Sequence, residues 1–174
     1  MSRISSKFFL IGATGAGKTT VGRLLAAKLG WQYLDLDEEI ESLCGADIPW
    51  IFDVVGEAGF RDREVKFLGE LAPMEEVVIS TGAGVVLRPE NQAVLRLYRC
   101  HVIWLKVDLK NQAERLKHDK NRPLLQVRDP KEKLRKMAIE REPLYEACSS
   151  IQIQTGKASP ASVVRQILQL SRVH

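Results

Sequence analysis

Residues 12–19 read GATGAGKT, a stretch that decides the fold because it fits the phosphate-binding pattern G-x-x-x-x-G-K-[ST]. A short apolar run at residues 8–11 predicts a buried strand before it, and apolar side chains recur at helical spacing after it. The glycines let backbone N–H groups converge on phosphate oxygens, and the N-terminus of the helix adds partial positive charge. We therefore expect a nucleoside triphosphate here, with Lys18 reaching its β- and γ-phosphates and Thr19 offering a hydroxyl to Mg²⁺.

The composition is that of one ordinary globular domain, since 174 residues suffice for a hydrophobic core. The net charge of +4 is modest and no basic tail is present, so we expect no nucleic-acid partner. The three cysteines are far apart and odd in number, which favours free thiols in a reducing cytoplasm. With no signal segment and no stretch of membrane-spanning length, we expect a cytoplasmic monomer without membrane attachment.

Short apolar runs alternate with helical patterns along the whole chain, which predicts an α/β domain of three layers. The candidate strands are residues 8–11, 32–34, 77–80, 101–107 and 150–154. Most are continuously apolar, as expected for a parallel sheet covered on both faces. Ligands of such sheets bind at the carboxyl ends of the strands.

Two segments depart from this alternation. Residues 37–71 are nearly all helical, with breaks near Gly45 and Gly56, and residues 117–129 are polar and basic. In a phosphotransferase, these segments suit a substrate-binding insertion and a closing lid. Beyond them, Asp129 resembles an N-cap, and Pro160 falls in the first turn of the last helix.

Several charged residues occupy positions that an apolar helix face would fill. Arg61 and Glu64 form either a surface ion pair or an arginine aimed at a cleft by its carboxylate partner. Arg141 interrupts an apolar stripe, and it either extends to solvent, the commoner case, or lines a polar cavity. Nearby, Pro143 is expected to kink or restart the helix.

Candidate ligand-binding residues also follow the second and third candidate strands. Asp35 and Asp37 are placed either to hold a magnesium-bound water or a substrate hydroxyl, or simply to begin a helix. The small residues at 82–84 either allow close approach of a ligand to the backbone or make a turn.

Taken together, these motifs resemble the shikimate kinase family from residue 8 to about residue 173. The matching motifs are GAGKT at 15–19, DLD at 35–37, GEAGFRDRE at 56–64, TGAG at 81–84, RPLL at 122–125 and REPLY at 141–145. The resemblance implies a P-loop fold of the nucleoside-monophosphate-kinase type. Its five parallel strands have the order 2-3-1-4-5, with helices on both faces. It also implies one kinase domain over residues 1–174, with a shikimate-binding subdomain at 37–71 and a lid at 117–129.

The family's activity is transfer of the γ-phosphoryl group of ATP to the 3-hydroxyl of shikimate. The resemblance implies catalytic roles for Lys18, Asp37 and Arg122. It implies ATP contacts at Gly15, Ala16, Gly17, Lys18, Thr19, Thr20, Arg115 and Arg122. It implies shikimate contacts at Asp37, Phe52, Phe60, Arg61, Gly82, Ala83, Gly84 and Arg141.

The resemblance also implies finer roles around these contacts. Thr19 would bind Mg²⁺ directly and Asp35 would do so through a water. The pair Arg61 and Arg141 would hold the carboxylate of shikimate, with Glu64 orienting Arg61. Arg115 would stack on adenine, with residues 155–160 on the other side of the ring.

The sequence departs from the family pattern at Ala83, where the family has the middle one of three glycines. The backbone N–H remains, but the methyl group either crowds the acceptor or requires a φ below zero. Another small-molecule kinase of this fold, such as a gluconate kinase, is the nearest alternative function. A nucleotide-dependent switch would need switch loops or a basic groove, and neither is evident.

Overall fold

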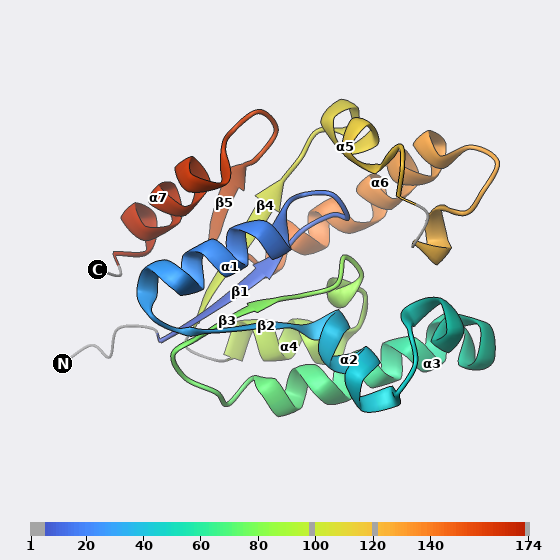
Figure 1. Ribbon diagram of the computed structural model, residues 1–174, viewed down its shortest axis with the longest axis horizontal. Helices are drawn as coiled ribbons and strands as arrows, with labels where there is room; N and C mark the ends of the chain where they lie inside the picture. Colours follow the sequence, from blue (N-terminus) through green and yellow to red (C-terminus); the bar gives the residue numbers. More distant parts are fainter. Residues whose placement is uncertain (1–5, 98–99, 120–121, 173–174) are drawn as a thin grey trace.

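A computed structural model of the chain describes residues 6–97, 100–119 and 122–172. A five-stranded parallel sheet lies at its centre, in the order β2-β3-β1-β4-β5 (Figure 1). The strands are β1 (Lys7–Ile11), β2 (Gln32–Asp35), β3 (Val77–Ser80), β4 (His101–Lys106) and β5 (Ile151–Gln154). The α/β class, the strand order and all five predicted strands are confirmed, with differences of one residue at several ends.

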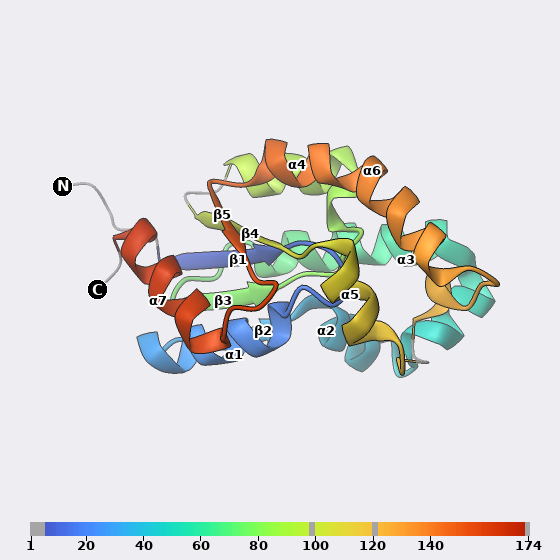
Figure 2. The ribbon, with the colours of Figure 1, turned by 90° about the horizontal axis from the view of Figure 1, so that it is seen from above.

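Helices cover both faces of the sheet, and Figure 2 shows the three layers. Helices α1 (Lys18–Leu29) and α7 (Pro160–Ser171) lie on one face. On the other face lie α3 (Ile48–Leu71), α4 (Pro89–Leu97) and α6 (Pro130–Cys148). The remaining helices are α2 (Leu36–Cys44), α5 (Leu109–Leu116) and the short 3₁₀ turns η1 (Val85–Leu87) and η2 (Pro123–Leu125).

Strand β1 shows why the sheet needs cover on both sides. Phe8 and Leu10 pack under α1 and α7, whereas Phe9 and Ile11 pack under the helices of the opposite face. All four side chains are fully buried. Continuous apolar strands therefore fill two cores at once, as in other doubly covered parallel sheets.

Helix ends follow the residues that the sequence offers as caps. Asp129 accepts a hydrogen bond from the Glu132 N–H at the start of α6, and Ser159 caps α7 directly before Pro160. Gly45 ends α2 in the left-handed conformation. Gly56, with φ 71° and ψ 178°, breaks α3 internally, so the predicted interruptions of residues 37–71 are confirmed.

The predicted restart of a helix near Pro143 does not occur, because α6 runs without interruption from Pro130 to Cys148. Proline removes one helical hydrogen bond, which leaves the carbonyl of Ile139 without its usual donor. Both Ile139 and Pro143 lie on the exposed side of α6, where water can satisfy that carbonyl. In the described part of the chain, no helix is long and apolar enough to cross a membrane.

Candidate active site

The phosphate loop joins β1 to α1 through three glycines with positive φ. Gly12, Gly15 and Gly17 have φ values of 141°, 82° and 93°. A Cβ atom at residue 12 would lie 2.5 Å from the carbonyl oxygen of Leu105 on β4, so only glycine fits there. Gly17 forms the N-cap of α1 without a side-chain cap, so the helix presents backbone N–H groups at this end.

Lys18 curls back over the loop, where its Nζ donates to the carbonyl oxygens of Gly12 (2.7 Å) and Ala13 (2.9 Å). Desolvation lowers the pKa of Lys18 to about 8, an effect that nearby Asp37 opposes. The amine remains largely protonated at neutral pH, as a phosphate ligand must be.

Helix α5 fastens the outer side of the phosphate loop. Gln112 donates to the carbonyl of Thr14 (2.8 Å), and Arg115 donates to the carbonyl of Gly15 (2.8 Å). The same guanidinium donates to the carbonyls of Thr155 (3.2 Å) and Gly156 (2.7 Å) after β5. Arg115 therefore joins the loop to the start of the segment at residues 155–160, and its stacking on adenine stays a prediction. The contact of Gln112 with the phosphate loop was not predicted, and the only hint in the sequence is that Gln112 lies three residues before Arg115.

Asp35 caps a helix, which is one of the alternatives that the sequence left open. Its Oδ1 accepts from the N–H groups of Asp37 and Glu38 and caps α2. Its Oδ2 accepts from the hydroxyls of Thr19 (3.2 Å) and Tyr33 (3.3 Å). Asp35 is thus a helix cap whose second oxygen faces the first turn of α1.

Asp37 is the second residue of α2, and one of its two carboxylate oxygens has no hydrogen-bond partner in the protein. Its Oδ1 is buried and makes no hydrogen bond. Desolvation and the neighbouring Asp35 raise the pKa of Asp37 to about 6, although Lys18, Arg122 and Arg61 oppose that rise. An unsatisfied carboxylate oxygen of this kind is ready to accept a hydrogen bond from a hydroxyl.

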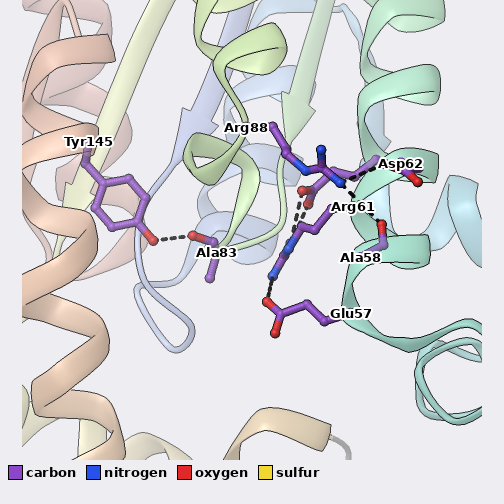
Figure 3. A network of polar contacts seen from close by, with 8 residues as sticks. Glu57, Ala58, Arg61, Asp62, Ala83, Arg88 and Tyr145 are labelled. Carbon is purple, nitrogen blue, oxygen red and sulfur yellow. Dashed lines mark hydrogen bonds and ion pairs between the residues drawn. The ribbon is translucent and has the colours of Figure 1, made fainter.

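Arg61 and Glu64 form a buried pair on α3, so the surface ion-pair alternative is wrong. Arg61 Nη1 donates to both carboxylate oxygens of Glu64, at 3.0 and 3.2 Å, and its Nη2 contacts Glu57 at 3.3 Å (Figure 3). Arg61 is 7% exposed and Glu64 is fully buried. Burial raises the pKa of Glu64 to about 7, and the guanidinium opposes that rise. Glu57 was not predicted as a partner of Arg61, although a spacing of four residues on a helix places two side chains next to each other.

Arg141 is also buried, at 5% exposed, and lines a cavity instead of extending to solvent. Its Nε is buried without a hydrogen-bond partner, as is the Nε of Arg61. The nearest carboxylate is Glu140, at 3.8 Å. Two buried guanidinium groups with unused donors make a site for an anion.

The turn after β3 approaches these charges closely. A Cβ at Gly82 would lie 2.9 Å from Asp37 Oδ1 and 3.0 Å from Glu64 Oε2. A Cβ at Gly84 would lie only 2.2 Å from Arg61 Nη2. Ala83 is different, because the described non-glycine residues with positive φ are Glu76 and Arg172. A Cβ at Gly82 or Gly84 would thus displace one of these side chains, and Ala83 is accommodated with φ below zero.

One cavity of about 670 Å³ contains most of the predicted positions. Its lining includes Gly15, Gly17, Lys18, Thr19, Thr20, Asp35, Asp37, Phe52, Phe60, Arg61, Gly82, Ala83, Gly84, Arg122 and Arg141. Two predicted residues lie outside it, since Ala16 is fully buried within the loop and Arg115 lies on the loop's outer side. Phe52 and Phe60 form an aromatic wall, with ring centroids 4.9 Å apart.

The polar segment at residues 117–129 contributes to the same cavity. Arg122 pairs with Asp119 at 3.3 Å and remains 46% exposed, and Leu124 and Leu125 add apolar lining. The structure also adds Thr81 and Met137 to the lining. Thr81 belongs to the TGAG motif at 81–84, but neither residue was predicted as a site residue.

The fold and this cavity define a P-loop kinase with a small anionic acceptor. The sequence model of the family described as shikimate kinase matches residues 14–172. The chain therefore belongs to the shikimate kinase family, and it is an ATP-dependent kinase.

Curated relatives support the same assignment over nearly the whole chain. A shikimate kinase of Chromohalobacter salexigens is 46% identical over 163 residues, which cover 94% of this chain and 90% of the relative. One of Actinobacillus pleuropneumoniae is 48% identical over 162 residues, or 93% of each chain. A structure of the Acinetobacter baumannii shikimate kinase, in complex with shikimate, superposes with a TM-score of 0.92 at 43% identity and covers 95% of this chain and 92% of that one.

A gluconokinase from Sinorhizobium meliloti shares the architecture at a greater distance. Its TM-score is 0.64 at 17% identity, over 98% of this chain and 93% of that chain. Similarity at this level shows the common fold alone, so it does not favour gluconate as the acceptor.

Proposed function

We propose that this kinase transfers the γ-phosphoryl group of ATP to the 3-hydroxyl of shikimate, giving shikimate 3-phosphate and ADP. One observation carries the proposal: a single cavity is lined by the phosphate loop, by the carboxylate of Asp37 and by two buried arginines, Arg61 and Arg141. Shikimate has one carboxylate and several hydroxyls, so its chemistry matches this arrangement.

The acceptor is held at its two ends by opposite charges. Arg61 and Arg141 donate charge-assisted hydrogen bonds to the carboxylate of shikimate, and Glu64 fixes the guanidinium of Arg61. Asp37 accepts from the hydroxyl that attacks the phosphoryl group, through the oxygen that has no protein partner. Phe52, Phe60 and the turn at residues 82–84 enclose the ring between these groups.

Electrostatics and positioning account for most of the catalysis of phosphoryl transfer. Backbone N–H groups from Gly15 to Thr20 bind the phosphates of ATP, and Lys18 leaves its loop carbonyls to neutralise the transferred group. Asp37 orients the attacking hydroxyl and takes up its proton late in the transfer. Arg122 adds a second positive charge from the segment at residues 117–129.

The start of α1 fits a Mg²⁺ ion. Thr19 Oγ1 and Asp35 Oδ2 lie 3.2 Å apart, and both are hard oxygen donors of the kind this ion prefers. In the described residues, no three His, Cys, Asp or Glu side chains gather into a metal cluster, which agrees with an ion bound mainly by phosphates and water. We propose that Thr19 binds the ion directly and Asp35 through a water. When bound, it supplies positive charge to the phosphates.

We further propose that residues 37–71 act as the acceptor-binding subdomain of a single kinase domain over residues 1–174, and residues 117–129 as its lid. Lid closure would exclude water and bring Arg122 to the phosphates. Arg115 and residues 155–160 would sandwich the adenine. We also propose a cytoplasmic monomer without nucleic-acid or membrane partners, and the three free thiols of Cys44, Cys100 and Cys148 support a reducing compartment.

The decisive experiment measures ADP release with shikimate, with gluconate and without an acceptor. We expect release to depend on shikimate and on Mg²⁺, and the product to be the 3-phosphate by NMR. Equal release without an acceptor would indicate an ATPase, and release that depends on gluconate alone would identify the alternative kinase.

A further inference from the structure

Tyr145 on α6 makes a contact that the proposed mechanism does not use. Its hydroxyl donates a hydrogen bond to the carbonyl oxygen of Ala83, 62 residues away in sequence (Figure 3). The ring is 1% exposed and packs against Trp104, with centroids 5.7 Å apart. Burial raises the pKa of Tyr145, so the hydroxyl remains a neutral donor.

The carbonyl that Tyr145 binds belongs to the middle of the turn at residues 82–84. Gly82 and Gly84 have no side chains, and a Cβ there would displace the carboxylates of Asp37 and Glu64 or the guanidinium of Arg61. Glycine has more conformational freedom than any other residue. A turn with glycine at two of its three positions is therefore more flexible than one built from residues with side chains. The N–H groups of Val85 and Leu87 donate to the carbonyls of Gly82 (3.2 Å) and Gly84 (3.0 Å), and the Tyr145 hydroxyl donates to the carbonyl between them.

Tyr145 is also linked to the acceptor site through its own helix. Arg141 lies four residues earlier, one helical turn along α6, and both side chains are buried. Ala83 and Arg141 line the 670 Å³ cavity and also a smaller one of about 220 Å³ behind it, to which Tyr145 contributes. The Tyr145–Ala83 contact thus lies in the partition between the two cavities.

We propose that Tyr145 is a positioning residue for the acceptor: its hydroxyl holds the turn at residues 82–84 at a fixed place relative to Arg61 and Arg141. Ala83 acts in the same direction, since its methyl group narrows the backbone conformations open to the turn. Two restraints, the Tyr145 hydroxyl on α6 and the methyl group of residue 83, therefore limit the movement of a turn that has glycine on both sides of that residue. The proposal rests on the proposed acceptor role of this cavity.

The test begins with Tyr145→Phe, which keeps the buried ring and removes only the hydroxyl. We expect the KM for shikimate to rise about 3- to 10-fold, as the loss of one net hydrogen bond implies. The KM for ATP should stay within about twofold, because the turn lies beside Asp37 and Arg61 of the acceptor half. General loosening of the fold would instead lower kcat and affect both substrates.

A double-mutant cycle with Ala83→Gly sharpens the test. Ala83→Gly alone should raise the KM for shikimate, because the turn gains conformational freedom, but by less than Tyr145→Phe does. In the Tyr145→Phe background, the same change should raise that KM at least about threefold more, a coupling that independent residues do not show. Arg88→Ala is the matched control, since Arg88 ties the same segment to Asp62 through a largely exposed ion pair (2.7 Å).

Three results would overturn the proposal: an unchanged KM for shikimate in Tyr145→Phe, additive effects in the cycle, or an equal rise of KM in Arg88→Ala. Activity of the unmodified chain separates this failure from a failure of the proposed function. Without ADP release that depends on shikimate in that chain, the proposed function itself is wrong. With it, a normal Tyr145→Phe variant refutes only the positioning role.

Discussion

The two halves of the cavity are built in different ways. The donor half is one continuous segment, residues 12–19, whose contacts are backbone N–H groups and a lysine that binds its own loop. The acceptor half draws charged side chains from α2, α3 and α6 and a turn from the end of β3. Backbone recognition suits a ligand that many proteins share, whereas buried side-chain charges suit one particular acceptor.

The acceptor half also contains buried polar atoms that have no hydrogen-bond partner before a ligand binds, and these atoms lower the stability of the fold. Arg61 and Arg141 each keep a buried Nε without a partner, and Asp37 keeps a buried oxygen in the same condition. Each unsatisfied group costs roughly 1–3 kcal/mol. Substitutions in the acceptor half should therefore have large and specific effects, while conservative ones in the donor half should have small effects.

The largest effect is expected for Asp37→Asn, which keeps the shape of the side chain but removes its charge. Loss of the group that orients the hydroxyl and accepts its proton should lower kcat about 10²- to 10⁴-fold. Binding of ATP, measured by calorimetry, should be nearly unchanged. A variant with more than a tenth of normal kcat would show that Asp37 does not act on the attacking hydroxyl.

A smaller but more selective loss is expected for Arg61→Ala and for Arg141→Ala. Removal of one charge-assisted pair should raise the KM for shikimate about 10- to 100-fold and leave the affinity for ATP intact. Arg63→Ala is the matched control on the same helix, because Arg63 binds the carbonyl of Gly59 and lies outside the cavity lining. Normal shikimate affinity in both variants would remove the carboxylate site from the acceptor half.

The sequence predicted the donor half almost completely and the acceptor half only by resemblance. The phosphate loop and its strand and helix are local, so their pattern appears within residues 8–29. The burial of Arg61 depends on Gly84, which is distant in sequence but would place a Cβ 2.2 Å from its guanidinium. Spacing along α3 could not separate this arrangement from a surface ion pair, because it carries no information on long-range contacts.

Arg141 illustrates the same limit. An arginine in an apolar stripe extends to solvent more often than it lines a cavity, so the residue alone favoured the wrong alternative. The cavity beside it exists because α6 packs over β4 and η1, which no local pattern reveals. The strands, by contrast, could be predicted from their apolar runs alone, and all five are present in the structure.

The acceptor half also makes the stability of the fold depend on pH, through Asp37. The pKa of Asp37 is raised from 3.8 to about 6, so the folded chain holds a proton that the unfolded chain releases. Its contribution to the free energy of unfolding therefore falls as pH rises from about 4 to about 6, and stays low above that. At pH 7, Asp37→Asn should be more stable than the parent by on the order of 1–2 kcal/mol.

Urea denaturation at pH 4, 5, 6 and 7 measures this difference, which should grow up to about pH 6 and then become constant. Asp47→Asn is a suitable comparison, because Asp47 caps α3 through the Trp50 N–H at 2.9 Å and should show no such gain. A stability difference for Asp37→Asn that is the same at all four pH values would refute the raised pKa.

A more moderate effect is expected where the acceptor half depends on glycine. In Gly84→Ala, the new methyl group must displace the guanidinium of Arg61, which should raise the KM for shikimate about 5- to 20-fold, at or below the lower end of the range for loss of one charged hydrogen bond. The displaced atoms end a flexible side chain, so the fold itself should be little affected. Measured thermal stability within a few degrees of the parent, together with a normal KM, would show that the turn does not restrain Arg61.

The smallest effect is expected in the donor half, for Thr19→Ser. The hydroxyl that lies 3.2 Å from Asp35 is retained, and the lost methyl group comes from an exposed residue, so little burial is removed. The phosphate-loop pattern itself accepts either residue. We expect kcat and both KM values within about twofold of the parent, and an unchanged requirement for Mg²⁺. Thr19→Val keeps the branched shape but removes the hydroxyl, and should raise the Mg²⁺ concentration needed for half-maximal activity. If Thr19→Ser altered the KM for shikimate as strongly as Gly84→Ala, the two halves would not be separable, because a change confined to the phosphate side would have reached the acceptor.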